Sequence, residues 1–182
     1  RMNKQINIGI IGTGHLGQYH VKHFLGLPNV NLVGIYDVNP KQTDIIQKTY
    51  AVNSFTSMEK LVESCDALSI VTPTETHAQV AKKCIEIGKH VFIEKPITKD
   101  IKEAEMLVRL AQENNVLIQV GHIERLNPAI LALKPFSVSP KFVEIQRLAP
   151  YTIRGTDVPV VLDLMIHDID ILLSIVDSRS EE

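Results

Sequence analysis

The sequence of 182 residues has too little of several features to belong to the protein classes that need them. Two cysteines, Cys65 and Cys84, are too few for a disulfide framework, and their spacing matches no zinc-binding pattern. The 19 Lys and Arg residues face 21 Asp and Glu, which excludes a strongly basic nucleic-acid-binding protein because no cationic excess can neutralise phosphates. The longest apolar runs have the length of strands, so we expect no membrane partner and a cytoplasmic protein.

The chain is nevertheless apolar enough for a folded core, since 45% of its residues are hydrophobic. Short β-branched apolar segments alternate with segments of helical periodicity, bounded by Gly, Pro, Ser and Asp. This alternation predicts an α/β fold, a Rossmann-type, doubly wound parallel sheet of about six strands. The strands that we place are residues 6–11, 31–36, 67–71, 90–93 and 116–120, and the helices are 15–26, 40–50, 57–62, 74–87 and 101–114.

The pattern changes after Gly121. Residues 142–148 alternate apolar and polar, which predicts a half-exposed antiparallel strand. Residues 160–176 form a predicted helix that carries acids and one histidine among aliphatic residues. We therefore expect a first domain over residues 1–120 and the beginning of a second, α+β domain over residues 121–182.

The first predicted strand ends in a G-x-G-x-x-G sequence, Gly12-Thr13-Gly14-His15-Leu16-Gly17, which leads directly into a helix. In this motif the first glycine permits a tight turn, and the second lets backbone N–H groups approach a pyrophosphate at the positive end of the helix. The third glycine lets the helix pack closely on the strand. The motif between a strand and a helix predicts a dinucleotide site.

Asp37 ends the second predicted strand, twenty residues beyond Gly17. An acid there accepts hydrogen bonds from the ribose hydroxyls of NAD and repels a 2′-phosphate, so we expect NAD rather than NADP. The alternative is that Asp37 only caps a turn. Thr72 and Pro73 end the next strand at the same edge of the sheet and are expected to line the cofactor. His77, one helical turn later, either faces the cofactor or lies at the surface.

Two further groups carry acid–base chemistry. Glu94 and Lys95 follow a strand and precede Pro96, where the lysine either meets a substrate or is a solvated turn residue. Asp163 and His167 are four residues apart on a predicted helix, so they share a face and can form an acid–base pair. They could also be zinc ligands, but no third ligand is evident nearby.

Together these elements resemble the Gfo/Idh/MocA family of oxidoreductases in both order and spacing, over nearly the whole chain. The Glu94-Lys95-Pro96 triplet is the most specific of them. The resemblance implies a dehydrogenase that transfers a hydride from a secondary hydroxyl of a sugar, nucleotide sugar or cyclitol to nicotinamide. It implies that Lys95 polarises the hydroxyl, His167 takes its proton and Asp163 positions the substrate or the imidazole. Glu94 would lie near the nicotinamide.

The segment Gly121-His122-Ile123-Glu124-Arg125-Leu126-Asn127-Pro128-Ala129 is similar to nucleotide-sugar members of the family, of the UDP-N-acetylglucosamine type. The similarity implies that Arg125 and Asn127 contact substrate or cofactor; the alternative is that Arg125 pairs with a Glu and fixes the domain junction. Two other functions compete: a non-catalytic NAD-binding module, and a reductase of another substrate. The joint presence of Lys95, Asp163 and His167 argues against both.

Family members continue into a large antiparallel sheet that covers the active site and usually builds the oligomer. The resemblance therefore implies that these residues are a truncated or partial enzyme, which binds NAD but turns over poorly. It also implies a homo-oligomer for the full-length protein.

Overall fold

The structure is a computed structural model that describes residues 5–136, 140–148 and 159–176. The chain divides into two compact units, Arg1–Val120 and Gly121–Glu182. We describe each unit by itself. Among the described residues, no helix combines the length and the apolar character that a membrane crossing requires.

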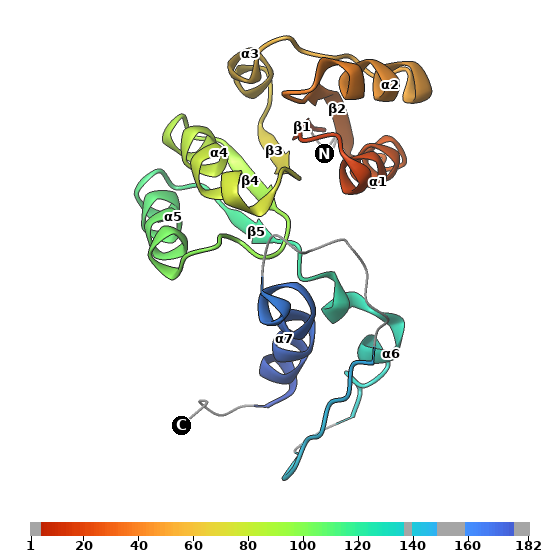
Figure 1. Ribbon diagram of the computed structural model, residues 1–182, viewed down its shortest axis with the longest axis vertical. Coiled ribbons are helices and arrows are strands. Elements are labelled where there is room, and N and C mark those ends of the chain that lie inside the picture. Colours follow the sequence, from red (N-terminus) through yellow and green to blue (C-terminus); the bar gives the residue numbers. More distant parts are fainter. Residues whose placement is uncertain (1–4, 137–139, 149–158, 177–182) are drawn as a thin grey trace. The chain divides into compact units, whose positions relative to one another are not determined.

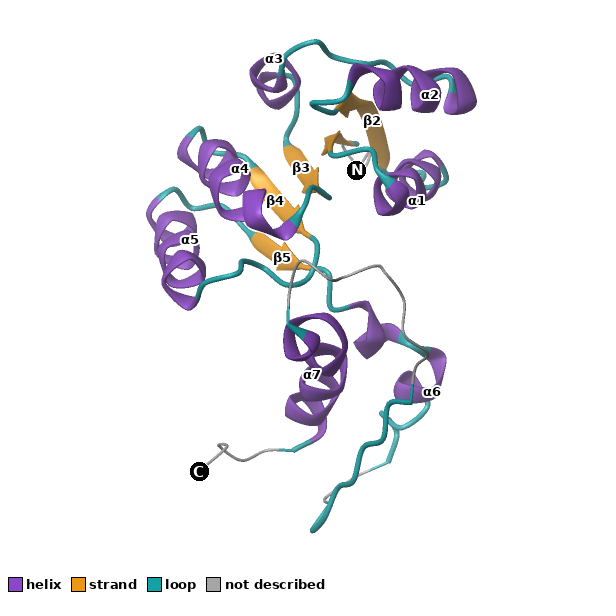
Figure 2. Ribbon diagram, in the orientation of Figure 1, coloured by secondary structure: helices purple, strands orange, loops and turns teal. Residues whose placement is uncertain are grey.

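The first unit is built on one parallel sheet with the strand order β2-β1-β3-β4-β5 (Figures 1 and 2). Every neighbouring pair in the sheet is parallel. Because β1 lies between β2 and β3, the chain adds strands first on one side of β1 and then on the other. Such a reversal creates a crevice at the carboxyl edge, where ligands of doubly wound sheets bind. The strands are β1 (Ile6–Ile11), β2 (Val30–Tyr36), β3 (Ala67–Ile70), β4 (His90–Ile93) and β5 (Ile118–Val120).

The expected Rossmann-type parallel α/β sheet is confirmed, and the described sheet has five strands where about six were expected. A further strand beside β2 would complete the usual order of such folds. At that place the chain makes a single parallel bridge, between Ile35 and Ser54. Two backbone hydrogen bonds hold the bridge, Ile35 N to Asn53 O at 2.9 Å and Phe55 N to Ile35 O at 2.9 Å. The chain then enters a short helix, so no ladder develops.

The helices of the first unit begin at the residues that local chemistry predicts. The side chains of Asn39, Ser57 and Asp100 each accept a hydrogen bond from a backbone N–H in the first turn, and Pro40 opens its helix. Gly14, in contrast, provides no side-chain cap. These helices are α1 (His15–Leu25), α2 (Pro40–Tyr50), α3 (Met58–Glu63), α4 (Thr74–Glu86) and α5 (Ile101–Glu113).

Each face of the sheet has its own hydrophobic core. Ile10 packs in the cluster that contains Val21 of α1 and Ile46 of α2. Its neighbour Ile11 packs in the cluster formed with α3, α4 and α5, which contains Leu107. Successive strand side chains point to opposite faces, so one strand supplies both cores. Burial on both faces explains why the strands read as continuous apolar runs.

The described part of the second unit is helical. It contains η1 (Ile123–Leu126), α6 (Pro128–Leu131), the π-helical turn η2 (Val161–Met165) and α7 (Ile166–Ile175). The predicted helix over residues 160–176 is confirmed, although its first turn is π-helical. The predicted strand over residues 142–148 is wrong, since these residues form no regular structure. They pair with no other described strand, and Phe142 and Leu148 are 82% and 93% exposed. An unpaired strand has no ladder to stabilise it.

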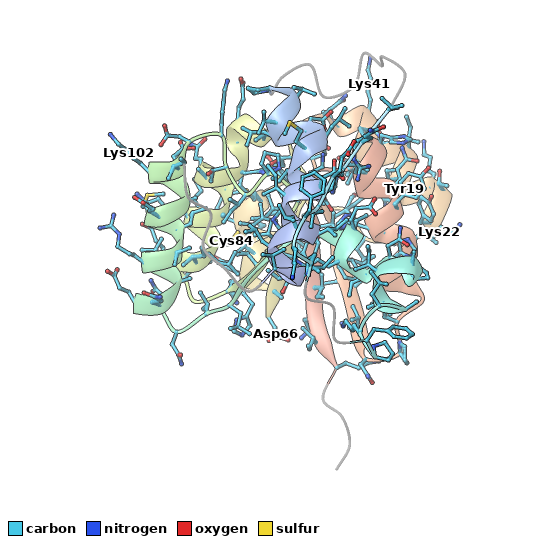
Figure 3. All side chains as sticks on the ribbon, turned by 90° about the horizontal axis from the view of Figure 1, so that it is seen from below. Tyr19, Lys22, Lys41, Asp66, Cys84 and Lys102 are labelled. Atoms are coloured by element: carbon cyan, nitrogen blue, oxygen red, sulfur yellow. The ribbon has the colours of Figure 1, made fainter. Side chains whose placement is uncertain are left out.

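Both cysteines lie in the core of the first unit, and Figure 3 shows Cys84 inside the fold while Lys102 projects outwards. Cys65 is 3% exposed and Cys84 is fully buried. Burial raises the pKa of the Cys65 thiol to about 11 and that of Cys84 to about 12. At neutral pH both thiols are therefore protonated and poorly nucleophilic.

The thiol pKa values predict slow chemical modification of the folded chain. At pH 8, Cys65 and Cys84 should react with a disulfide reagent such as DTNB at least about 100-fold more slowly than free cysteine, because little thiolate is present and access is blocked. Both should react fully in guanidinium chloride. Rapid labelling of either thiol in the native chain would contradict this buried placement.

Candidate functional site

The G-x-G-x-x-G sequence forms a turn that allows no side chain at two of its glycines. Gly12 has φ +94°, and a Cβ there would lie 2.6 Å from Val71 O. A Cβ on Gly17 would collide with Gly12 O. Gly14 differs, because a Cβ at this position would have no atom within 4 Å. The start of α1 is therefore packed against β1, while the space beside Gly14 and the uncapped N–H groups of α1 is open to a ligand.

Asp37 is held by the glycine turn. Its Oδ2 accepts hydrogen bonds from Thr13 N at 2.7 Å and Thr13 Oγ1 at 3.1 Å, and its Oδ1 accepts one from Asn39 N at 2.8 Å. Thr13 is fully buried. Thr13, predicted as a cofactor contact, therefore orients the carboxylate of Asp37. Because the turn holds the carboxylate, the predicted ribose acceptor is preorganised.

A cavity of about 790 Å³ lies at this carboxyl edge, a volume suited to a dinucleotide. Seven of the predicted cofactor residues line the cavity: Gly12, Gly14, His15, Leu16, Asp37, Thr72 and Pro73. Thr13, Gly17, His77, Glu94 and Lys95 do not line it. An uncapped helix start, a carboxylate and a cavity of this volume together suit a pyrophosphate joined to a ribose.

Sequence reasoning missed the cavity wall that α3 and α4 form. Thr76, Gln79, Val80 and Lys83 line the cavity from α4, and Met58 and Glu59 line it from α3. The signal was available, because these α4 residues follow the three-and-four spacing of one helix face. The pKa of Glu59 is lowered, first by a 2.7 Å hydrogen bond from Ser57 Oγ and to a smaller extent by the charge of Lys83.

His77 lies in the interior, so the structure places it neither in the cavity nor at the surface. It is 1% exposed. Its Nδ1 lies 2.9 Å from Pro96 O and its Nε2 lies 2.8 Å from Thr72 O. The ring thereby connects the loop after β3 with the loop after β4. Both alternatives expected for His77 are therefore wrong, because α4 packs against both loops and directs the ring into the interior.

Glu94 and Lys95 follow β4, and Glu94 N donates to Ile70 O at 3.0 Å, which extends the pairing with β3. Oε2 of Glu94 accepts a hydrogen bond from Lys95 N at 3.2 Å. Oε1 lies 3.0 Å from Nε2 of His20 on α1. The sequence assigned no function to His20, so this contact is a finding of the structure. Both Glu94 and Lys95 are partly buried.

In the second unit, Asp163 lies in the π-helical turn η2 and His167 lies in the first turn of α7. Both side chains are partly buried. A π-helical turn is rare and occurs frequently at functional sites, because the inserted residue changes which side chains share a face. Asp163 of the predicted acid–histidine pair thus lies in the π-helical turn, and His167 lies in the α-helical turn that follows it.

Arg125 and Asn127, the predicted substrate contacts, have structural partners in the second unit. Arg125 donates from Nε and Nη2 to both carboxylate oxygens of Asp170, at 2.6 and 2.5 Å. Asp170 is 6% exposed, and its Oδ1 lies 3.7 Å from His122 Nδ1. Asn127 Oδ1 accepts a hydrogen bond from Ala129 N and caps α6. The expected Arg–Glu pair is therefore wrong in its partner, because Arg125 pairs with Asp170 of α7 within the second unit.

A second ion pair holds residues 142–148 to α7. Arg147 donates to Asp168 from Nε at 2.8 Å and from Nη2 at 2.6 Å. Hydrogen bonding by Arg147 lowers the pKa of Asp168.

Among the described residues, no cluster of three or more His, Cys, Asp or Glu side chains could hold a metal ion.

Comparison with known proteins identifies the fold and the family. Residues 6–122 match the Gfo/Idh/MocA family, described as an oxidoreductase family with an NAD-binding Rossmann fold. The chain is 40% identical over 166 residues to UDP-N-acetylglucosamine 3-dehydrogenase of Acidithiobacillus ferrooxidans. The aligned residues cover 91% of this chain and 52% of that protein. It is 32% identical over 132 residues to scyllo-inositol 2-dehydrogenase (NAD(+)) of Bacillus subtilis, covering 70% of this chain and 39% of that protein.

The solved structures agree. That of UDP-N-acetylglucosamine 3-dehydrogenase from Acidithiobacillus ferrooxidans superposes with a TM-score of 0.92 at 37% identity, covering 98% of this chain and 59% of that one. The chain thus spans about half the length of the curated relatives it matches. The family match over residues 6–122 agrees with the glycine turn and with the oriented carboxylate of Asp37. The chain belongs to the Gfo/Idh/MocA family of oxidoreductases, whose Rossmann fold binds NAD.

Proposed function

We propose that the protein is an NAD-dependent dehydrogenase that oxidises a secondary hydroxyl of a nucleotide sugar of the UDP-N-acetylglucosamine type. The observation that carries the proposal is the cavity at the carboxyl edge, where Gly14 leaves room for a pyrophosphate and Asp37 presents an oriented carboxylate. Family membership supports the redox chemistry. The relative at 40% identity supports the substrate class, since its name states UDP-N-acetylglucosamine.

The residues at the cavity divide the binding of the cofactor between them. Asp37 accepts hydrogen bonds from the ribose hydroxyls and repels a 2′-phosphate, so NAD is preferred over NADP. The N–H groups at the start of α1 bind the pyrophosphate, aided by the helix dipole. When bound, NAD supplies a nicotinamide ring that accepts a hydride. Thr72 and Pro73 line the cavity at the end of β3.

The chain's own side chains handle the proton and the charge of the substrate hydroxyl. The ammonium group of Lys95 polarises the hydroxyl and stabilises the alkoxide that develops as the hydride leaves. The imidazole of His167 takes the hydroxyl proton, and Asp163 orients the substrate or that imidazole. Residues 1–120 then serve the cofactor, and residues 121–182 begin a part that serves the substrate and the assembly of a homo-oligomer. Arg125, anchored by Asp170, supports this second part.

Two glycine variants separate cofactor binding from folding. Gly14→Ala should keep the thermal midpoint of the wild-type chain but weaken NAD binding about tenfold or more, because the new methyl group occupies the pyrophosphate space. Gly17→Ala should instead destabilise the fold by about 1–3 kcal/mol through its collision with Gly12 O. Calorimetric titration and thermal denaturation measure both effects. Equal NAD affinity for Gly14→Ala and wild type would count against this cofactor site.

Asp37→Asn tests the choice of cofactor. Removing the negative charge should lower the preference for NAD over NADP about tenfold, because repulsion of the 2′-phosphate is lost. The control is Asp44→Asn, which changes an exposed aspartate of α2. Dissociation constants of NAD and NADP for the three proteins measure the preference. An unchanged ratio in Asp37→Asn would assign the carboxylate a purely structural role at the turn.

Turnover by the whole protein tests the reaction. With NAD and UDP-N-acetylglucosamine, absorbance at 340 nm should rise, and scyllo-inositol should be a poorer substrate. Lys95→Ala should lower kcat about 100-fold or more with little change in NAD affinity, since the lysine acts on the substrate alkoxide. Lys102→Ala, an exposed lysine of α5, is the control. Full activity in Lys95→Ala would refute the role of the lysine.

A further inference from the structure

A chain of polar contacts crosses the first unit from β3 through α1 to the end of β4. Ser69 Oγ lies 2.9 Å from Nδ1 of His20, and Nε2 of His20 lies 3.0 Å from Oε1 of Glu94. Ser69 is fully buried, and the side chains of His20 and Glu94 are only 16% and 14% exposed. None of the roles assigned above accounts for Ser69 or His20.

Strand alternation explains why these residues meet. Leu68 and Ile70 pack into the core on the α3, α4 and α5 face, so Ser69 between them points to the opposite face. That face is covered by α1, which carries His20. Phe92 is likewise flanked by Val91 and Ile93 of the first core. The ring of His20 makes an edge contact with Phe92, with the ring centroids 5.6 Å apart.

The hydrogen bonds that link Ser69, His20 and Glu94 orient the carboxylate of Glu94. An ionised carboxylate only accepts hydrogen bonds, so Nε2 of His20 donates. Nδ1 of the neutral ring then accepts, and the hydroxyl of Ser69 is its donor. The carboxylate of Glu94 thus selects the tautomer in which Nε2 of His20 donates, and Ser69 complements it as the donor to Nδ1. Because Lys95 N donates to the other oxygen at 3.2 Å, both oxygens of Glu94 are held.

The sheet order indicates which part of a cofactor Glu94 faces. Asp37 follows β2, the glycine turn follows β1, and Glu94 follows β4 on the far side of β3. An extended dinucleotide with its adenosine ribose at Asp37 and its pyrophosphate at Gly14 has its nicotinamide half towards β3 and β4. A fixed carboxylate there can accept a hydrogen bond from the carboxamide or ribose of that half.

We propose that His20 is a positioning residue which, hydrogen-bonded to Ser69, holds the Glu94 carboxylate as the acceptor for the nicotinamide half of NAD. The inference rests on the proposed cofactor function and extends it. It assigns a role to the helix that binds the pyrophosphate, because the same α1 then organises both ends of the site. His20 acts through Glu94 and contacts no reacting atom.

The test compares NAD with ADP-ribose, which lacks the nicotinamide ring. In the wild-type chain and in His20→Ala, dissociation constants are measured for both ligands by calorimetric titration. His20→Ala should weaken NAD binding about tenfold while ADP-ribose binding stays within about twofold, because a charge-assisted hydrogen bond to the carboxylate is lost. His23→Ala, an exposed histidine on the same helix, is the matched control and should change neither ligand.

Further variants exclude a merely structural effect. His20→Gln keeps an N–H donor and should therefore restore part of the NAD affinity. Ser69→Ala should raise the dissociation constant of NAD, as His20→Ala does, but by a smaller factor. In a Glu94→Gln background, His20→Ala should have no additional effect on the ratio of the two constants, since the two residues act as one unit.

The outcomes of these titrations distinguish a failure of the proposed cofactor function from a failure of the role of His20. If the wild-type chain fails to bind NAD, the proposed cofactor function is overturned, and the role of His20 with it. If wild type binds NAD and His20→Ala leaves the NAD to ADP-ribose ratio unchanged, only the role of His20 is overturned. Equal losses of both ligands in His20→Ala would also overturn it, because they would show damage to α1 itself.

Discussion

The contact between the first turn of α1 and the end of β1 determines how the whole cofactor edge is built. Gly17 lies against Gly12 O, and Gly12 in turn lies against the backbone of Val71 and Thr72, with no room for a Cβ. The start of α1, the turn after β1 and the backbone after β3 therefore lie in contact with one another, with no side chain between them. That approach brings the open helix terminus next to the crevice between β1 and β3, where a phosphate can be bound by N–H groups alone.

Side chains from distant elements then hold the loops around this contact. Thr13 fixes Asp37 after β2, His77 joins the loops after β3 and β4, and His20 reaches Glu94. In each case the partner is a loop residue, so these contacts attach the loops to the sheet and its helices. Catalytic groups need such support, since small displacements of reacting atoms cost large factors in rate.

In the second unit, ion pairs between arginine and aspartate hold the described segments together. Its described part has helices but no sheet, and two arginines supply the cross-links. Arg125 is bidentate on the buried Asp170, and Arg147 is bidentate on Asp168, two residues earlier. Guanidinium–carboxylate pairs of this kind fix orientation as well as distance. They hold η1 and residues 142–148 to α7, the helix that carries His167.

The sequence by itself determined the parallel α/β fold, the glycine turn, seven of the cavity residues and the starts of the helices in the first unit, because apolar periodicity, caps and glycine spacing are local properties. It did not determine the conformation of residues 142–148, since strand formation depends on a partner elsewhere in the chain. Nor did it determine the roles of His77 and His20. A histidine within an apolar helix face and Ser69 within an apolar strand were visible signals. Only the tertiary structure decided that they meet, because α1 packs on the sheet face to which Ser69 and Glu94 both point.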